Sequence, residues 1–252
     1  MVIQSKSELI LRNRLDAKFK KAVRQYGLIQ VNDRILIGLS GGKDSLVLLE
    51  LFVRLRKTWG VKFDLVAVHI NIVNILYQAD VGYLKSFCES FDIPFFYRES
   101  SFSSDEIEHK SICFSCSRHR RKELFKLSKE LNCNKIALGH HMDDITQTLL
   151  MNLFFQGSFT TMPPLFSPIK VDITFIRPLA LIREYEIEKL SKLNQYQLIT
   201  SVCPFENETS RYTVKKILSE LEINHPDVYQ NIFNAMENID PLYLPTKFQQ
   251  DI

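Results

Sequence analysis

Six consecutive residues combine small, hydroxyl, cationic and acidic groups: Ser40-Gly41-Gly42-Lys43-Asp44-Ser45. The apolar run 34–39 before them predicts a buried strand, and the apolar run 46–53 after them predicts a helix. A glycine turn between a strand and a helix leaves backbone N–H groups open at the helix start, where the helix dipole favours an anion. The serine hydroxyls and the lysine add donors. The segment therefore predicts a phosphate-binding site.

The run lacks the G-x-x-x-x-G-K-[ST] spacing of a Walker A loop. It resembles instead the Ser-Gly-Gly-x-Asp-Ser signature of the PP-loop, or N-type, ATP pyrophosphatases. Enzymes of that type split ATP between the α and β phosphates and transfer AMP to an oxygen of the substrate. The resemblance implies that residues 40–45 bind ATP and that Lys43 and Asp44 act in catalysis. The alternative is a turn that only joins a strand to a helix.

A second group of polar residues follows another predicted strand: Gly139-His140-His141-Met142-Asp143-Asp144. A helix cap accounts for one of the two aspartates. Carboxylates beside a triphosphate are the expected ligands of Mg²⁺, so we predict that Asp143 and Asp144 are catalytic and hold this ion. The Gly-His-x-x-Asp-Asp pattern also resembles the tRNA-modifying branch of the PP-loop proteins, which adds Gly139, His140 and His69 to the expected ATP contacts.

The five cysteines fall into two kinds. Cys88 and Cys133 stand singly in helical or helix-end contexts and are predicted to be core residues. Cys113 and Cys116 form a C-x-x-C pair, and Cys203 lies far along the chain. Such a pair can be a redox pair or half a zinc site. Three thiolates can also hold a [4Fe–4S] cluster with one iron open to a ligand such as sulfide; three unrelated thiols are the alternative.

Four segments together resemble the tRNA 2-thiocytidine synthetases over roughly residues 11–244. They are Cys113-x-x-Cys116-Ser117-Arg118-x-Arg120-Arg121, Ala137-Leu138-Gly139-His140-His141-x-Asp143-Asp144-x-x-Gln147-Thr148-Leu149, Met162-Pro163-Pro164 and Ile176-Arg177-Pro178-Leu179-Ala180. In that family ATP adenylates the C2 oxygen of a cytidine in the tRNA anticodon loop, at position 32, and sulfur then replaces this oxygen. The resemblance implies a [4Fe–4S] cluster on Cys113, Cys116 and Cys203, although Thr200 stands where many members have a fourth cysteine.

Other readings stay open. A lysidine synthetase would use an amine and would not need the cysteines, whereas a 2-thiouridine synthetase of the related group would carry paired zinc knuckles that this sequence lacks. An RNA-binding module that carries a cluster but does not turn over is a further alternative. Thiolation without a cluster is another, with a persulfide on Cys113 or Cys203 as the sulfur carrier.

The implied partners are tRNA, ATP and a sulfur donor, which we expect to be a cysteine desulfurase system. We predict that Arg118, Arg120, Arg121 and Arg177 contact tRNA, because phosphate contacts dominate nucleic-acid affinity. A solvated helix face is the alternative for the basic run 118–122. The oligomeric state stays open, with a homodimer among the options.

The 252 residues are 45% hydrophobic and 24% charged, with a net charge of +3, which is typical of an ordinary globular protein. No apolar run reaches the length of a membrane span, and the first residues lack the apolar core of a signal peptide. We therefore expect a cytoplasmic protein that does not enter a membrane.

Strands predicted at 34–39, 64–70, 93–97 and 135–139 alternate with helices at 46–53, 81–91, 116–131 and 143–155. This alternation predicts an α/β fold whose parallel sheet has helices on both faces, with ligands bound beyond the carboxyl ends of the strands. The resemblance identifies it with the PP-loop, or adenine nucleotide α-hydrolase-like, fold. Residues 156–172 are expected to form a long connection or flap, and 175–179 a last edge strand.

We predict three parts of the chain. They are an N-terminal helical segment at 1–30, a PP-loop ATP-pyrophosphatase domain at 31–182 and a C-terminal helical extension at 183–252 that carries Cys203.

Overall fold

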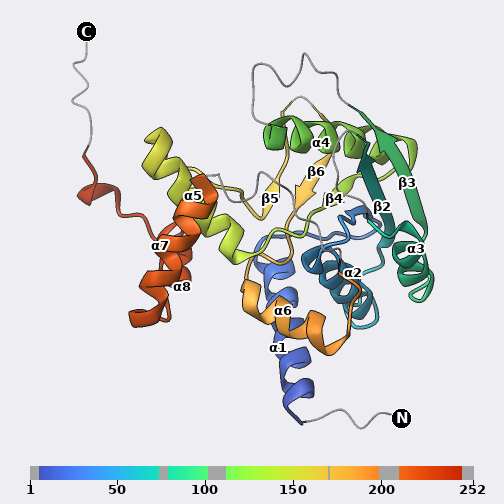
Figure 1. The fold of residues 1–252 in the computed structure, drawn as a ribbon, viewed down its shortest axis with the longest axis horizontal. Helices are drawn as coiled ribbons and strands as arrows, with labels where there is room; N and C mark the ends of the chain where they lie inside the picture. Colours follow the sequence, from blue (N-terminus) through green and yellow to red (C-terminus); the bar gives the residue numbers. More distant parts are fainter. Residues whose placement is uncertain (1–5, 74–78, 102–111, 170, 199–209, 246–252) are drawn as a thin grey trace.

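The computed structural model describes residues 6–73, 79–101, 112–169, 171–198 and 210–245, without the side chains of 112–115. Its centre is a six-stranded sheet in the order β3-β2-β1-β4-β6-β5 (Figure 1). The strands are β1 (Arg34–Gly38), β2 (Asp64–Ile72), β3 (Phe95–Ser100), β4 (Lys135–Ala137), β5 (Leu165–Phe166) and β6 (Thr174–Ile176). The first four strands and β6 run parallel, and β5 pairs antiparallel with β6.

Nine helical segments are described. They are α1 (Lys6–Gln25), α2 (Lys43–Arg56), α3 (Val81–Glu89), α4 (Ile112–Glu130), α5 (Met142–Gln156), α6 (Glu184–Leu193), α7 (Ser210–Asn224), α8 (Val228–Ala235) and the short 3-10 helix η3 (Pro241–Tyr243). None of these helices is long and apolar enough to cross a membrane.

Successive residues of β1 face opposite sides of the sheet, as the pleat of a strand requires. Ile35 and Ile37 are fully buried in a core shared with α1, α2 and α6, whereas Leu36 is buried in a second core beneath α4. The predicted α/β fold with helices on both faces is therefore confirmed. The predicted core positions of Cys88 and Cys133 are confirmed too, since both side chains are buried.

One prediction about the end of the sheet was wrong. The segment 175–179 is not the edge strand, because β5 lies outside β6 and pairs with it through Leu165 and Phe166. That edge strand comes from the segment expected to be a flap, and it makes the sheet mixed rather than wholly parallel. A two-residue strand is too short to show the period-2 alternation that reveals strands in a sequence.

Helices α5, α7 and α8 form a separate group beside the sheet (Figure 1). Val214 and Leu218 of α7 are fully buried against Tyr229 of α8 and against Leu150 of α5. This packing holds the C-terminal part of the chain against α5, the helix that begins within the Gly139–Asp144 motif. The predicted boundaries at 1–30, 31–182 and 183–252 stay a prediction.

Candidate active site

The Ser40–Ser45 loop joins the end of β1 to the start of α2. Gly41 has a φ of 87°, in the region that glycine adopts without strain. The Ser45 hydroxyl closes the turn by donating to the Gly42 carbonyl at 2.9 Å and accepting from the Ser40 N–H at 3.2 Å. No side chain caps the N-terminus of α2, so its first N–H groups are left for an anion.

Gly139 brings the second motif against this loop. A Cβ atom at residue 139 would lie 3.1 Å from the carbonyl carbon of Asp44 and 3.2 Å from the backbone nitrogen of Ser45. Only glycine allows so close an approach without displacing backbone. The absence of a side chain at this position therefore lets the end of β4 meet the start of α2.

Three carboxylates surround the buried His141 side chain. Its Nε2 lies 3.8 Å from Asp44 Oδ1 and 3.4 Å from Asp144 Oδ2, and its Nδ1 lies 3.6 Å from Asp143 Oδ2. Burial opposes the charged imidazolium, but the three carboxylates outweigh it and raise the pKa of His141. Sequence reasoning placed His140 among the ATP contacts and missed the central position of His141, its neighbour in the same motif.

Asp44 and Asp143 have pKa values shifted in opposite directions. Burial raises the pKa of Asp44, against the lowering effects of His141 and Lys43. For Asp143 burial acts the same way, but His141, Arg183 and the Glu184 N–H together lower its pKa. The cations and the N–H group around Asp143 thus outweigh the cost of burying its negative charge. Those around Asp44 do not, so Asp44 is suited to receive a further cation.

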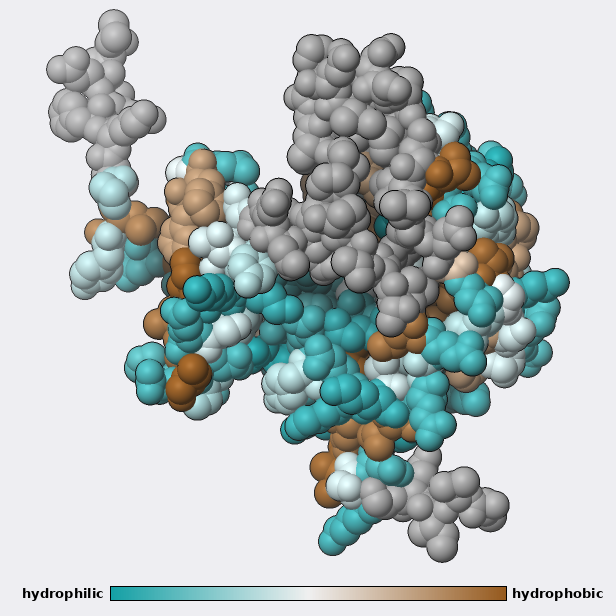
Figure 2. Space-filling view, viewed as in Figure 1, coloured by the Kyte–Doolittle hydropathy of each residue, from teal (hydrophilic) through white to brown (hydrophobic). Residues whose placement is uncertain are grey.

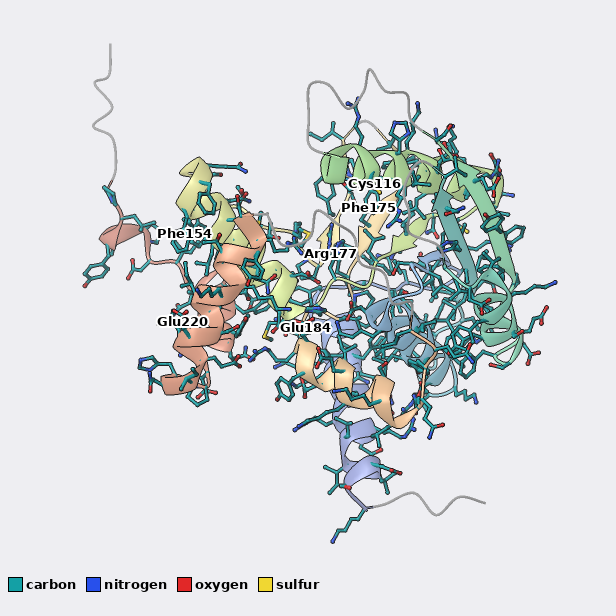
Figure 3. The ribbon with its side chains drawn as sticks, in the orientation of Figure 1. Cys116, Phe154, Phe175, Arg177, Glu184 and Glu220 are labelled. Atoms are coloured by element: carbon teal, nitrogen blue, oxygen red, sulfur yellow. The ribbon has the colours of Figure 1, made fainter. Side chains whose placement is uncertain are left out.

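The C-terminal part of the chain supplies cations that sequence reasoning missed. Arg183 Nε lies 3.1 Å from Asp143 Oδ1, and Arg211 Nη1 lies 2.8 Å from Asp144 Oδ1. Glu184 joins two lysines, because its carboxylate lies 2.9 Å from Lys43 Nζ and 3.0 Å from Lys215 Nζ. The PP-loop lysine is therefore held between Asp44 and α6, and α6 is tied to α7. Figure 3 shows Glu184 at the start of α6, near the foot of α5.

The two histidines predicted to contact ATP are His69, which is buried, and His140, which is partly buried. His69, on β2, lies with Nδ1 2.7 Å from the Leu39 carbonyl and stacks against Tyr97. Its Nε2 lacks a hydrogen-bond partner among the described residues, as does Nδ1 of His140. Burial lowers the pKa of His140 to about 4, so its ring is neutral at pH 7. Both rings thus carry a buried nitrogen that a ligand can satisfy, in keeping with their predicted role as ATP contacts.

One carboxylate oxygen of Asp44 is available to a magnesium ion. The buried Oδ1 atom of Asp44 lies 3.5 Å from Lys43 Nζ, and no described group donates a hydrogen bond to it. In the described part of the chain, however, no three His, Cys, Asp or Glu side chains are grouped as a complete metal site. Asp143 and Asp144 are engaged by arginines, so their assignment to Mg²⁺ stays a prediction.

The structure describes only part of the predicted cluster ligands. Cys113 and Cys116 both belong to the first turns of α4, three residues apart along the chain. Helix N-termini favour thiolates. Cys116 is partly buried and packs against the core beneath α4, where Figure 3 shows it above Phe175. Cys203 and the Cys113 side chain lie outside the described residues.

The predicted tRNA-binding arginines occupy three different environments. Arg118 and Arg121 are exposed on α4, whereas Arg120 is partly buried close enough to His69 to lower the pKa of that ring. Arg177 is only 8% exposed, and its Nη1 donates to the Pro163 carbonyl at 2.6 Å. Burial lowers the pKa of Arg177 to about 10. Arg177 therefore lies inside the site, and only the α4 pair has the exposure expected of a surface contact.

This fold and loop define a class of protein. A protein-family model described as "PP-loop domain" matches residues 11–221, which include the Ser40–Ser45 loop, the Gly139–Asp144 motif and Arg183 and Arg211.

Relatives of known function make the assignment more specific. The tRNA-cytidine(32) 2-sulfurtransferase of Geobacter sulfurreducens is 37% identical over 233 residues, covering 89% of each chain. The protein of that name from Methylococcus capsulatus is 37% identical over 93% of this chain and 82% of its own. The chain thus belongs to the tRNA-cytidine(32) 2-sulfurtransferase family of PP-loop proteins. This confirms the resemblance seen in the motifs and does not favour the lysidine, 2-thiouridine or non-enzymatic alternatives.

A solved structure has the same fold. The U34-tRNA thiolase NcsA from Methanococcus maripaludis, determined with its [4Fe-4S] cluster, has a TM-score of 0.75 and 28% sequence identity. The match covers 92% of this chain and 79% of that one.

Proposed function

We propose that this protein uses ATP to replace the C2 oxygen of cytidine 32 in the tRNA anticodon loop with sulfur, giving 2-thiocytidine. The observation that carries the proposal is the convergence of the Ser40–Ser45 loop and the Gly139–Asp144 motif. Gly139 lies against the backbone of the loop, and His141 lies within 3.8 Å of a carboxylate oxygen of Asp44, Asp143 and Asp144. Membership of the tRNA-cytidine(32) 2-sulfurtransferase family supports the choice of tRNA and of cytidine.

The first step activates a poor leaving group. The C2 oxygen of the pyrimidine attacks the α-phosphorus of ATP, the bond to the β-phosphate oxygen breaks and pyrophosphate departs. The open N–H groups of α2 and the Lys43 ammonium would stabilise the negative charge that gathers on pyrophosphate. Lys43 can do so because burial is outweighed by Asp44 and Glu184, which raise its pKa and keep it charged. A magnesium ion, with Asp44 among its ligands, would add to this neutralisation.

The second step exchanges oxygen for sulfur. A sulfur nucleophile attacks C2, the C2–O bond breaks and AMP leaves with the original oxygen. Cys113, Cys116 and Cys203 are the residues proposed to hold a [4Fe–4S] cluster, which supplies an iron able to carry sulfide. We infer that a cysteine desulfurase system provides the sulfur and that the reaction takes place in the cytoplasm. A homodimer is the assembly to test by light scattering.

The test is release of AMP and pyrophosphate in the presence of tRNA. Asp44→Ala and Ser45→Ala should each abolish release, because one removes the loop carboxylate that lies beside Lys43 and His141 and the other opens the turn. Asp64→Ala is the matched control. Asp64 is an exposed aspartate at the start of β2, and β1 and β2 are parallel, so Asp64 lies at the opposite edge of the sheet from the loop that follows β1. Pyrophosphate release by Asp44→Ala at the parent rate would overturn the proposal.

A further inference from the structure

The outer face of α4 forms an open, cation-lined groove of about 680 Å³. Five basic side chains line it: Arg118, Arg121, Lys122, Lys126 and Lys129. Its apolar lining comes from Phe125 and from Val171, which follows the β5 segment along the chain. No acidic side chain is among these lining residues.

Helical periodicity separates this groove from the buried side of α4. The basic residues recur at intervals of three and four along one side of the helix, whereas Leu124 and Leu127 are buried in the core beneath it. Arg120 lies on the buried side, near His69. The basic run 118–122 therefore supplies two surfaces, of which one faces the site and the other faces solvent.

The charges in the groove are only partly compensated. Lys126 forms an ion pair with Glu123 at 2.6 Å, but within the described chain Arg118, Lys122 and Lys129 have no ion-pair partner. Like charges three and four residues apart on a helix repel one another. An anionic partner seated in the groove would remove that repulsion.

The groove has the shape and the position of a site for a nucleic-acid backbone. Lys129 lies eleven positions after Arg118, so the groove runs for about 16 Å along the helix at about 1.5 Å per residue. Phe125 is fixed by an edge-to-face contact with Phe175 of β6 at 5.1 Å. At one end Arg121 is close enough to Arg177 to contribute to the lowering of that residue's pKa, so the groove starts beside the active site and leads away from it.

We propose that this α4 groove binds the phosphate backbone of the tRNA anticodon stem while a nucleotide of the loop reacts at the Ser40–Ser45 site. The inference rests on the proposed function and adds a second tRNA contact to it. Backbone contacts of this kind position a nucleic acid without reading its bases. The groove would therefore contribute to the affinity for tRNA and to the position of the tRNA on the protein. The loop nucleotide alone would contact the catalytic residues.

The experiment compares Lys122→Glu/Lys129→Glu with the wild type on two RNAs, a full tRNA and a single-stranded oligonucleotide of the anticodon loop alone. Loss of two phosphate contacts should reduce the slope of log affinity against log salt by about two for the tRNA. Affinity for tRNA should fall about tenfold or more at moderate salt. Affinity for the loop oligonucleotide and for ATP should not change.

Two further variants keep the test decisive. Lys57→Glu/Lys62→Glu makes the same charge change at exposed lysines in the connection that precedes β2, and it should leave the slope unaltered. Lys122→Gln/Lys129→Gln replaces the first variant if the charge reversal unfolds α4. It removes the two charges without reversing them and should give a similar loss of slope.

Wild-type salt dependence in both groove variants would overturn the inference. Unchanged tRNA affinity together with impaired sulfur transfer from a protein donor would also overturn it, and would assign the groove to an acidic protein. Failure of the wild type to thiolate tRNA would instead refute the proposed function, and this is measured first.

Discussion

Replacing Gly139 with alanine tests the contact that assembles the site. The new Cβ would meet three backbone atoms: the carbonyl carbon of Asp44 at 3.1 Å, the nitrogen of Ser45 at 3.2 Å and the carbonyl oxygen of Asp44 at 3.3 Å. Backbone cannot rotate away as a side chain does, so α2 and β4 must separate by a few tenths of an ångström.

The expected cost is that of a small overpacked core, about 1–3 kcal/mol. For a protein of this size each kcal/mol lowers Tm by roughly 2–4 °C, so Gly139→Ala should melt about 2–12 °C below the wild type. The displacement also moves Asp44 relative to the His141–Asp144 segment. Misplacement of catalytic groups by 1 Å costs about a hundredfold in rate, and we expect a loss on the order of tenfold for this smaller shift.

Gly38→Ala is the matched control, because its Cβ would make ordinary contacts of 3.6 Å and 3.7 Å with the side chains of Leu138 and Leu124. Thermal melting and pyrophosphate release should be measured on both variants. Gly38→Ala should behave like the wild type in both assays. A wild-type Tm and rate in Gly139→Ala would refute the close contact and, with it, the assembly of the site through this glycine.

Three further predictions concern the carboxylates of the site and the proposed cluster ligands. Arg211→Ala should lower ATP turnover several-fold, because Asp144 loses a cation at 2.8 Å, whereas Lys216→Ala on the exposed side of α7 should not; equal rates would dismiss the role of α7. Asp144→Asn should raise the Mg²⁺ concentration needed for AMP formation, and an unchanged Mg²⁺ dependence counts against Asp144 as a ligand. Cys116→Ser should lose the roughly four irons of an anaerobically reconstituted cluster, whereas Cys133→Ser, at a buried core position, should keep them; iron retained in Cys116→Ser would contradict the ligand assignment.

The β1–loop–α2 unit could be predicted from the sequence because its features are local. An apolar run, a glycine turn and a second apolar run each follow from neighbouring residues, and the structure has β1 end at Gly38 and α2 begin at Lys43. Strand β5 was missed for a physical reason as well. Its pairing with β6 is a tertiary contact of two residues, flanked by prolines that are typical of loops.

The cations around the carboxylates could not be found in the same way. Arg183, Arg211 and Lys215 are ordinary charged residues in a helical region, and their spacing shows no motif. Arg211 and Lys215 reach Asp144 and Glu184 from α7, which packs against α5, and Arg183 reaches Asp143 from the residue before α6. Figure 2 shows hydrophilic residues concentrated on the face between this helical group and the sheet. The partners of a charge are set by packing, and packing between distant segments leaves no pattern in a single sequence.

The most direct test of the central claim is mass analysis of tRNA nucleosides from cells with and without this gene. We predict that 2-thiocytidine is present when the gene is present, is absent when it is deleted and returns with the wild-type gene but not with Asp44→Ala. Unchanged 2-thiocytidine in the deletion strain, or loss of 2-thiouridine or lysidine in its place, would contradict the proposed function.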